Sequence, residues 1–537
     1  MLSAFAVPHL FHTLPRFVNR PRHFSLISIP RRLIFGLRAI IHIGFLLLCV
    51  RFLEASIRNT FVVFSATLML VAPGIALGFW RPRAALFAFN IYVIILLCLA
   101  QSALLDCVSP PSIVFCATYI GIAVRQLIGW TTSQKTINSL ELQSNTQAAD
   151  STIVVLWIVD LLITAVLCSL VVEILRHRSQ PGFLQDLWIR PIFGFGDSYY
   201  FISSAFLWLQ GLFFFRLIVA LPQTTADTTG SASTWIALYF ATCIIVLLVS
   251  FLLQTIYQIP ITPDWFAGMV LGVSLPYEDS HAYGSVAAAA FAYAAATWSC
   301  ASRAKALRHA VITAVLFGFV VASWSRAAWV AAIMALIIVA LQKLPLKWSS
   351  GITAGVVAGI LGFSWARRDS WGGNPFLFRL ENLVRIDQPR IYLYHKAFGM
   401  IRERPLLGHG IGASHNSSVR FAQAGDPLAN VPEFMHNFIL QIATEQGSII
   451  AALYVGLIVW VLWRGFRASI YNRFLDAYEH KTAIAASIAL ATYLLTQMTA
   501  NSLNVYISNQ FFFWFLLAAI FSATATSNTT WKMSWHR

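Results

Sequence analysis

The chain has 537 residues, of which 58% are hydrophobic and only 11% are charged. A soluble domain carries about 25% charged residues, and many apolar runs here reach the roughly 18 residues needed to cross a bilayer. This composition excludes a soluble protein and predicts an all-α polytopic membrane protein, since continuous rather than alternating runs argue against a β-barrel. The net charge of +16 does not indicate nucleic-acid binding, because most basic residues lie in short loops between apolar runs.

The first 38 residues are basic, and they lack the small-residue cleavage site of a signal peptide. We expect residues 1–38 to form a cytoplasmic leader. The apolar runs that follow, interrupted by prolines and polar residues, indicate about 12–14 crossings. The predicted divisions are N-terminal transmembrane helices (39–234), core transmembrane helices (235–366), one large periplasmic loop with amphipathic helices (367–435), C-terminal transmembrane helices (436–523) and a cytoplasmic tail (524–537).

Short basic segments predict which side of the membrane each loop faces. The segments 303–308, 343–347 and 464–481 contain several Lys and Arg residues, so we expect them in the cytoplasm. Counting spans between them puts the loop 367–435 on the opposite face. The basic segment 176–182 looks cytoplasmic by its charge, whereas strict alternation of spans from a cytoplasmic N-terminus would put it outside.

The seven cysteines lie in or beside apolar runs. None forms a CxxC motif or a cluster with histidine. We interpret them as small apolar side chains and expect neither a disulfide framework nor a metal site.

Arginines gather at the expected outer face. Arg326 follows Ser325 between two apolar runs, and an arginine near the membrane is costly unless it reaches an interface, a partner or a ligand. Arg390 begins a segment with helical spacing, which Arg402 and Arg404 close before a proline and three glycines. Guanidinium groups bind phosphate through paired hydrogen bonds. The alternative is that these arginines only contact lipid headgroups.

The residues His436 and Asn437 lie where the chain enters an apolar run at 436–463. Gln441 and Glu445 follow, and on a helix their side chains share a face. Ionisable groups inside spans usually face the protein interior and mark function, and histidine suits proton transfer near neutral pH. A lone interfacial histidine is more often structural, and Glu445 fits packing as well as bracing of the histidine.

Two further polar segments are ambiguous. Glu278, Asp279 and His281 precede an alanine-rich run, where a helix cap explains them at least as well as a site does. A second His-Asn pair, His415 and Asn416, lacks the apolar helix and the following glutamate. We therefore leave that pair out of the predicted site.

Three motifs occur in order: SRAAWVAA, then RPLLGHGIG after the loop helix, then HNFILQIATEQG. Together they resemble the O-antigen ligase superfamily, which includes O-antigen ligases, O-antigen and exopolysaccharide polymerases and some protein O-oligosaccharyltransferases. The resemblance covers roughly 235–525. It implies that His436, Arg390 and Arg326 are catalytic, and substrate binding is assigned with it to Arg402, Arg404, Asn437 and His281. His281 stands where the family commonly has Asn, which leaves its role open.

The resemblance implies a transferase in the bacterial inner membrane whose active site faces the periplasm. The donor would be a glycan on undecaprenyl diphosphate, and the acceptor a hydroxyl of a glycan or of lipid A–core. Arg326 and Arg390 would bind the diphosphate and stabilise its growing charge, while His436 would deprotonate or orient the acceptor. Membrane lipids are expected partners, and no nucleic acid, metal or cofactor is expected.

The sequence leaves other functions open. Within the transferases, it does not choose between a ligase, a polymerase and a protein O-oligosaccharyltransferase, because the motifs are shared. A transporter or flippase of lipid-linked glycans is the main alternative, and it draws support from Asp160 and Arg216 within apolar runs. A membrane scaffold is a third, for which replacing His436 or Arg390 would change nothing.

Overall fold

The computed structural model describes the chain in segments. They are residues 31–60, 71–82, 84–86, 88–89, 110–132, 146–183, 185–186, 199–220, 232–257, 280–297, 303–323, 325–343, 351, 355, 388–427, 429–430, 434–471, 477–498 and 507–530. Most of the expected leader, the start of the expected loop up to residue 387 and the end of the expected tail lie outside the described residues.

Helices make up all of the described secondary structure, as the composition predicts. The α-helices are α1 (Arg31–Thr60), α3 (Val71–Trp80), α5 (Pro110–Thr132), α7 (Thr146–His177), α9 (Tyr200–Ala220), α10 (Ala232–Tyr257), α12 (Ser280–Thr297), α13 (Arg303–Ala322), α14 (Arg326–Lys343), α17 (Gln388–Glu403), α18 (Ser414–Ser417), α19 (Phe438–Gln446), α20 (Ser448–Tyr471), α21 (Ala477–Gln497) and α23 (Ile507–Thr530). A short 3-10 helix, η3, spans Ser418–Phe421.

Three stretches among the described residues are long and apolar enough to cross a membrane. They are Ser151–His177 in α7, Tyr200–Ala220 in α9 and Ser448–Arg467 in α20. Shorter apolar helices accompany them, among them Arg326–Gln342 in α14. The chain is an all-α polytopic membrane protein, and the number of crossings stays a prediction.

The chain divides into two compact units, Met1–Gly44 and Phe45–Arg537. The described part of the first unit is the beginning of α1. All packing described below belongs to the second unit.

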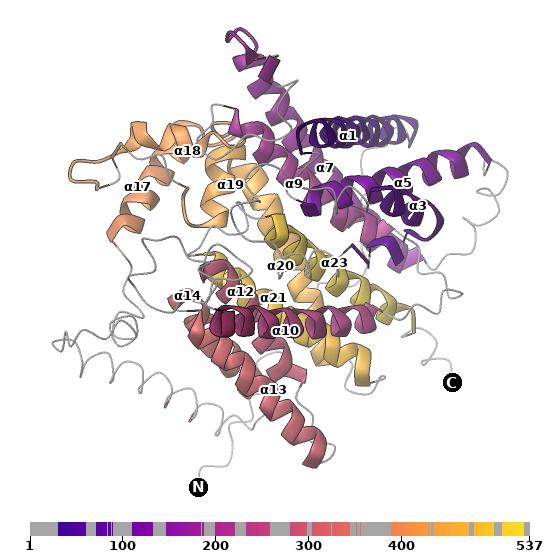
Figure 1. Cartoon of the computed structure of the whole chain (residues 1–537), viewed down its shortest axis with the longest axis vertical. Helices are drawn as coiled ribbons and strands as arrows, with labels where there is room; N and C mark the ends of the chain where they lie inside the picture. Colours follow the sequence, from indigo (N-terminus) through magenta and orange to yellow (C-terminus); the bar gives the residue numbers. More distant parts are fainter. Residues whose placement is uncertain are drawn as a thin grey trace, which may run out of the picture. The chain divides into compact units, whose positions relative to one another are not determined.

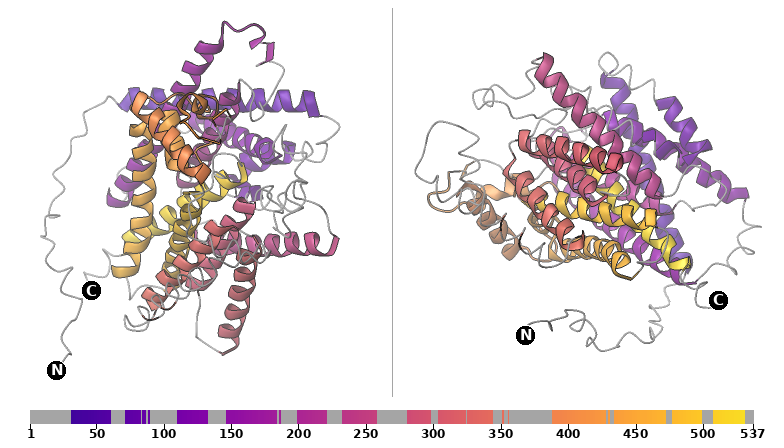
Figure 2. Two further views of the ribbon diagram at one scale, coloured as in Figure 1. Left: turned by 90° about the vertical axis from the view of Figure 1, so that its left-hand side faces the viewer. Right: turned by 90° about the horizontal axis from the view of Figure 1, so that it is seen from below.

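Within the second unit, α12 packs against α13, α14 and α21 (Figure 2). Its side chains from Ala287 to Ala290 are completely buried. Small side chains allow the backbones of membrane helices to approach closely, which explains the alanine-rich run. Elsewhere in this unit, α9 packs against α7 and against the distant C-terminal helix α23 (Figure 1).

A charged pair joins α7 to α9. The Nε of Arg216 donates to Oδ1 of Asp160 across 2.7 Å, and the two side chains are 11% and 7% exposed. Charges inside a membrane bundle are tolerated when they pair with one another. This pair therefore accounts for two residues that, in sequence, favoured a transporter.

The expected run at 436–463 is not one helix. α19 ends at Gln446, and α20 begins at Ser448. Gly447 separates them with φ of 87°, a backbone conformation that residues other than glycine rarely adopt. The result is that Glu445 lies in a short helix before the span rather than inside it.

The end of α7 lies on the same side of the membrane as the loop after α17. Nη1 of Arg176 donates to the carbonyl of His409, and the backbone N–H of Ile411 donates to Oγ of Ser169. The expectation of a cytoplasmic segment 176–182 therefore conflicts with that of a periplasmic loop. Strict alternation of spans would remove the conflict by putting both segments outside, and the side that they face stays a prediction.

Candidate functional site

The segment from Pro405 to Ser414, here called the glycine loop, wraps around the end of α19. The backbone N–H groups of His409 and Gly410 donate to the carbonyls of Thr444 and Glu445 across 2.8 and 2.9 Å. The carbonyl of Pro405 in turn accepts from Ser448 N–H. These bonds satisfy carbonyls that a helix end leaves without partners, and they fix the loop to α19.

The glycines of this loop are required by close approach. Gly408 has φ of 65°, and a Cβ there would overlap the carbonyl of Glu445. Gly410 has φ of 107°, and a Cβ there would overlap the carboxylate of Glu173 on α7. The proline and glycines predicted to end the helix therefore lie in a segment that packs closely against both α7 and α19.

Glu445 is the centre of a buried hydrogen-bond network. Its Oε1 accepts from Oγ of Ser414 across 2.6 Å and from Nε2 of Gln441 across 2.5 Å. Gln441 also contacts Ser414 through Nε2 and accepts from Met435 N–H through Oε1. Burial raises the pKa of Glu445, while the bonds from Ser414, the Gly412 backbone and Gln441 oppose that shift. Glu445 therefore braces the loop, and the shared helix face predicted for Gln441 and Glu445 is confirmed.

His436 has a strained backbone at the mouth of α19. Its φ of 46° makes it the one non-glycine residue with positive φ among the described residues. Such strain persists only where the surroundings impose it, and it often occurs at functional sites. The side chain is half-buried.

Asn437 holds this conformation in place. It is the N-cap of α19, where its Oδ1 accepts from the N–H groups of Ile439 and Leu440 at 3.1 Å each. Its Nδ2 donates to the carbonyl of Met498, just after α21. Both ends of the amide thus form hydrogen bonds within the fold, and substrate binding by Asn437 stays a prediction.

Arg326 begins α14 at a tight corner after α13. Oγ of Ser325 accepts from Ala328 N–H at 3.4 Å, and Nε1 of Trp329 donates to the carbonyl of Val320 at 2.9 Å. A Cβ on Gly284 of α12 would overlap Ser325, so this corner lies directly against the start of α12. The side chain of Arg326 is half-buried.

The end of α21 connects α12, which lies against this corner, to α17 and the mouth of α19. On one side, Oγ of Ser285 in α12 contacts Oγ1 of Thr496 at 2.7 Å and accepts from Nε2 of Gln497 at 3.2 Å. On the other side, the carbonyl of Met498 accepts from Tyr394 on α17 as well as from Asn437. The helices α12, α17 and α19 thus meet around the end of α21. They carry or adjoin the predicted site residues His281, Arg390 and Asn437.

α17 is fixed by buried contacts along one face. Lys396 and Asp426 form an ion pair of 3.1 Å in which both side chains are fully buried. Ala397 and Met400 pack with Met435, directly before His436. Arg390 lies one turn before Tyr394 with a half-buried side chain.

The two arginines that close α17 differ. Arg402 and Arg404 are both exposed, but only Arg404 lines a cavity between the end of α7, the start of α9 and the loop after α17. The cavity has a volume of about 380 Å³. Its lining residues are Glu173, Arg176, His177, Tyr200, Phe201, Arg404, His409, Gly412, Ala413, Asn416, Ser417 and Arg420.

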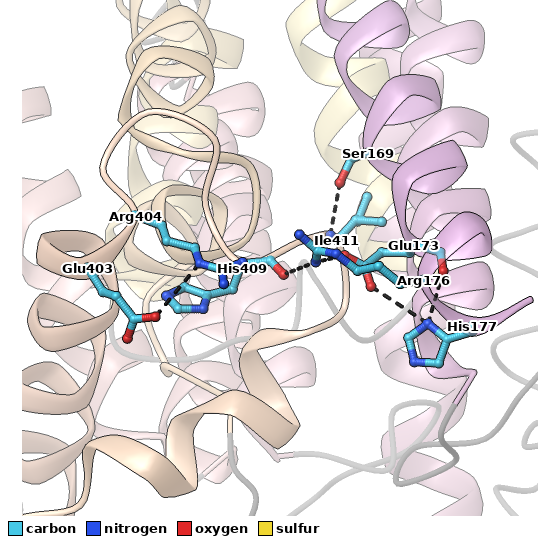
Figure 3. Close-up of polar contacts among 8 residues, drawn as sticks. All are labelled: Ser169, Glu173, Arg176, His177, Glu403, Arg404, His409 and Ile411. Atoms are coloured by element: carbon cyan, nitrogen blue, oxygen red, sulfur yellow. Dashed lines mark hydrogen bonds and ion pairs between the residues drawn. The ribbon is translucent and has the colours of Figure 1, made fainter. Parts of the chain in front are cut away.

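Figure 3 shows two polar clusters side by side at this cavity. Glu173 contacts Arg176 at 2.5 Å and His177 at 3.9 Å on α7. His409 is buried, its Nε2 lies 3.1 Å from the carbonyl of Met400, and burial lowers its pKa. Since a low pKa keeps the imidazole neutral, the positive charge here comes chiefly from arginine.

The sequence reasoning missed most of this cavity. Arg176, His177, His409 and Arg420 were not predicted, and only Arg404 was. Arg176 is more than 200 residues from His409 in the chain, so no local spacing could connect the two. The side chain of His281 lies outside the described residues, and so does the Glu278–Asp279 pair.

Residues 310–455 match a family model described as O-antigen ligase. The matched range includes Arg326, Arg390 and His436, together with the glycine loop. No curated protein matches the chain. The family match confirms the resemblance drawn from the three motifs.

Proposed function

The chain carries a domain of the O-antigen ligase family, and on that premise we propose that it transfers a glycan from undecaprenyl diphosphate to an acceptor hydroxyl. The reaction would take place at the periplasmic face of the bacterial inner membrane. The acceptor oxygen would attack the sugar carbon bonded to the diphosphate. The bond from that carbon to the diphosphate oxygen would break, and the diphosphate would leave with the electron pair.

The predicted residues divide the work of this reaction, and Asn437 contributes to substrate binding beside His436. Arg326 and Arg390 bind the diphosphate and stabilise its increasing negative charge. His436 accepts the proton of the acceptor hydroxyl, for which a neutral imidazole is suited near pH 7. Arg402 and Arg404 bind the substrate farther along the loop, and the role of His281 is substrate binding at the start of α12.

The observation that carries the proposal is the meeting of four elements around the end of α21. Met498 accepts from Tyr394 and Asn437, while Thr496 and Gln497 contact Ser285. These contacts connect α17 and the mouth of α19 to α12, whose Gly284 lies against the corner before Arg326. A reaction of two lipid-bound substrates requires such fixed geometry, because orientation supplies much of the rate.

The strained His436 supports the same conclusion. Positive φ in a non-glycine residue costs about 1–2 kcal/mol, and the cap by Asn437 and the packing of Met435 sustain it. A conformation held at such cost is expected where the direction of a side chain matters. The transporter alternative loses its sequence argument, because Asp160 and Arg216 neutralise each other.

Substitution tests the three catalytic assignments. His436→Ala, Arg390→Ala and Arg326→Ala should each abolish glycan transfer while the protein reaches the membrane at its normal level. Wild-type transfer by any one variant would remove that residue from the mechanism.

Gene deletion distinguishes the acceptors. Accumulated long lipid-linked chains with a bare final acceptor would identify a ligase, and accumulated single repeat units would identify a polymerase. An unchanged pool of lipid-linked glycans, with no redundant enzyme, would contradict both.

A further inference from the structure

The cavity between α7 and the loop after α17 carries positive charge that the protein does not neutralise. Its three arginines are Arg176, Arg404 and Arg420, and its one acidic lining residue is Glu173. Glu173 is already matched by Arg176 at 2.5 Å. The cavity therefore has an excess of arginine over carboxylate.

The other two arginines have weak contacts within the protein. Arg404 lies 3.7 Å from the adjacent Glu403, in a pair whose side chains are each 44% exposed. Arg420 lies 5.8 Å from the ring centroid of its neighbour Phe421. Exposed pairs of this kind contribute little, so both guanidinium groups remain able to bind an anion.

Polar and aromatic groups complete the cavity. Asn416 and Ser417 add side chains that donate hydrogen bonds, and the N-terminus of α9 contributes through Tyr200 and Phe201. The positive end of a helix dipole favours anions. Phe201 lies buried at the cavity wall, stacked on His177 with ring centroids 5.0 Å apart, and limits the cavity on that side.

The dimensions suit a small ligand group. A volume of about 380 Å³ is at the lower end of small-molecule sites. It matches one sugar unit rather than an oligosaccharide or a lipid chain. The loop that lines the cavity also contacts α19 through the backbone bonds of His409 and Gly410. A ligand in the cavity would therefore be held at a fixed position relative to α19, which His436 precedes.

We propose that this cavity binds one sugar unit bearing a phosphate or carboxylate group, on a glycan engaged by the transferase. Arg404 and Arg420 would bind the anionic group, and the side chains of Asn416 and Ser417 would form hydrogen bonds with the sugar hydroxyls. The proposal rests on the proposed function only in taking the ligand to be a saccharide. It makes the cavity a second recognition site, separate from Arg326, Arg390 and His436.

Equilibrium binding to the full-length protein tests the proposal without turnover. The protein is purified in a polyoxyethylene detergent, whose head group contains no sugar or charge. The probes are glucose 6-phosphate, glucuronate, glucose and inorganic phosphate, each titrated by calorimetry. A sugar phosphate that binds better than glucuronate would identify phosphate as the anionic group, and the reverse order would identify a carboxylate.

We expect at least one anionic sugar to bind more tightly than both glucose and inorganic phosphate. Arg404→Gln and Arg420→Gln should each weaken that binding about ten-fold, as expected for a charge-assisted hydrogen bond. The matched control is Arg178→Gln, an exposed arginine at the same end of α7 that does not line the cavity. It should bind like the wild type.

Three results would overturn the proposal. They are no binding of either anionic sugar, equal binding of inorganic phosphate, and unchanged binding in the Arg404→Gln, Arg420→Gln double variant. A thermal melt of each variant shows that it is folded, which is expected because both arginines are exposed. If His436→Ala retained full transfer while binding proceeded as expected, the proposed mechanism would fail and the cavity assignment would stand.

Discussion

The hydroxyl of Ser414 donates to the carboxylate of Glu445 across 2.6 Å, from the end of the glycine loop to the last turn of α19. Both side chains are almost completely buried. The bond connects the loop that lines the cavity to the helix that begins at the predicted base. Together with the backbone bonds of His409, Gly410 and Ser448, it fixes the loop to α19.

Removing this acceptor should destabilise the protein. In Glu445→Ala, Ser414, Gln441 and the Gly412 backbone N–H would lose a buried acceptor, which should lower the free energy of unfolding by roughly 2–4 kcal/mol. Denaturation in mixed micelles measures the change. Glu403→Ala provides the control, since that exposed carboxylate should change stability by less than about 0.5 kcal/mol. Equal stability of the two variants would contradict the bracing role.

Gly410→Ala should separate the loop from α7. The new methyl group would overlap Glu173 at a positive φ, so strain and overlap add together. Gly182→Ala is the matched control, because Gly182 has φ of 81° and open space around its Cβ. The control should cost about 1–2 kcal/mol, and Gly410→Ala clearly more. Thermal melts of both variants compare them, and a smaller loss at Gly410 would show that the joint yields easily.

Two substitutions of Asn437 should distinguish its role in capping α19 from its role in catalysis. Asn437→Asp keeps an N-cap oxygen for α19 but loses the donor to Met498, whereas Asn437→Ala loses both and about 1 kcal/mol of cap energy. We expect Asn437→Asp to lose some stability, because a carboxylate oxygen would face the Met498 carbonyl, but to remain folded with a lower kcat. Kinetics alongside melts measure both. A normal kcat in the aspartate variant would show that the bond to Met498 does not position His436.

His409 should make stability depend on pH. Burial lowers its pKa in the folded protein, so the unfolded chain takes up the proton first as the pH falls below about 6.5. The stability contributed by the neutral imidazole is complete above that pH and is lost as the pH falls through the folded-state pKa. Melting temperatures across this range should fall less steeply in His409→Gln. Parallel curves for the two proteins would contradict this origin.

Asp160 and Arg216 should behave as a matched pair. Asp160→Leu or Arg216→Met alone would leave a buried charge unpaired and cost about 3–5 kcal/mol, while the double variant should recover most of that loss. The double variant should also retain glycan transfer, because the pair lies outside the proposed site. Membrane levels and transfer assays check both points. Loss of transfer in a stable double variant would return a transport role to consideration.

The sequence alone predicts the helical class and the motifs of the reaction, because both depend on local composition and spacing. His436, Arg390 and Arg326 follow from short motifs, and the end of α21 that connects their elements does not. Met498 acts through its carbonyl oxygen, which every residue type possesses. Its role therefore has no signature in the sequence.

The cavity escaped prediction for a different reason. Arg176 and Arg420 become neighbours only because α7 ends beside a loop more than 200 residues away. By charge, the positive-inside rule would place Arg176 and the loop on opposite sides of the membrane, whereas the two are in contact. A cluster of arginines that binds an anion and a cluster that faces the cytoplasm look alike in sequence, and only the tertiary contact separates them.

Because the end of α7 and the loop after α17 lie on the same side, the number of membrane crossings between them must be even. A chain that leaves one face at His177 and returns to it at Gln388 must cross an even number of times in between. Five described helices, α9, α10, α12, α13 and α14, lie on that path, and five single crossings would be odd. The apolar run that the sequence places at 350–366 would make the number even. Reporter fusions after residues 177, 345 and 404 would then alternate as outside, inside and outside.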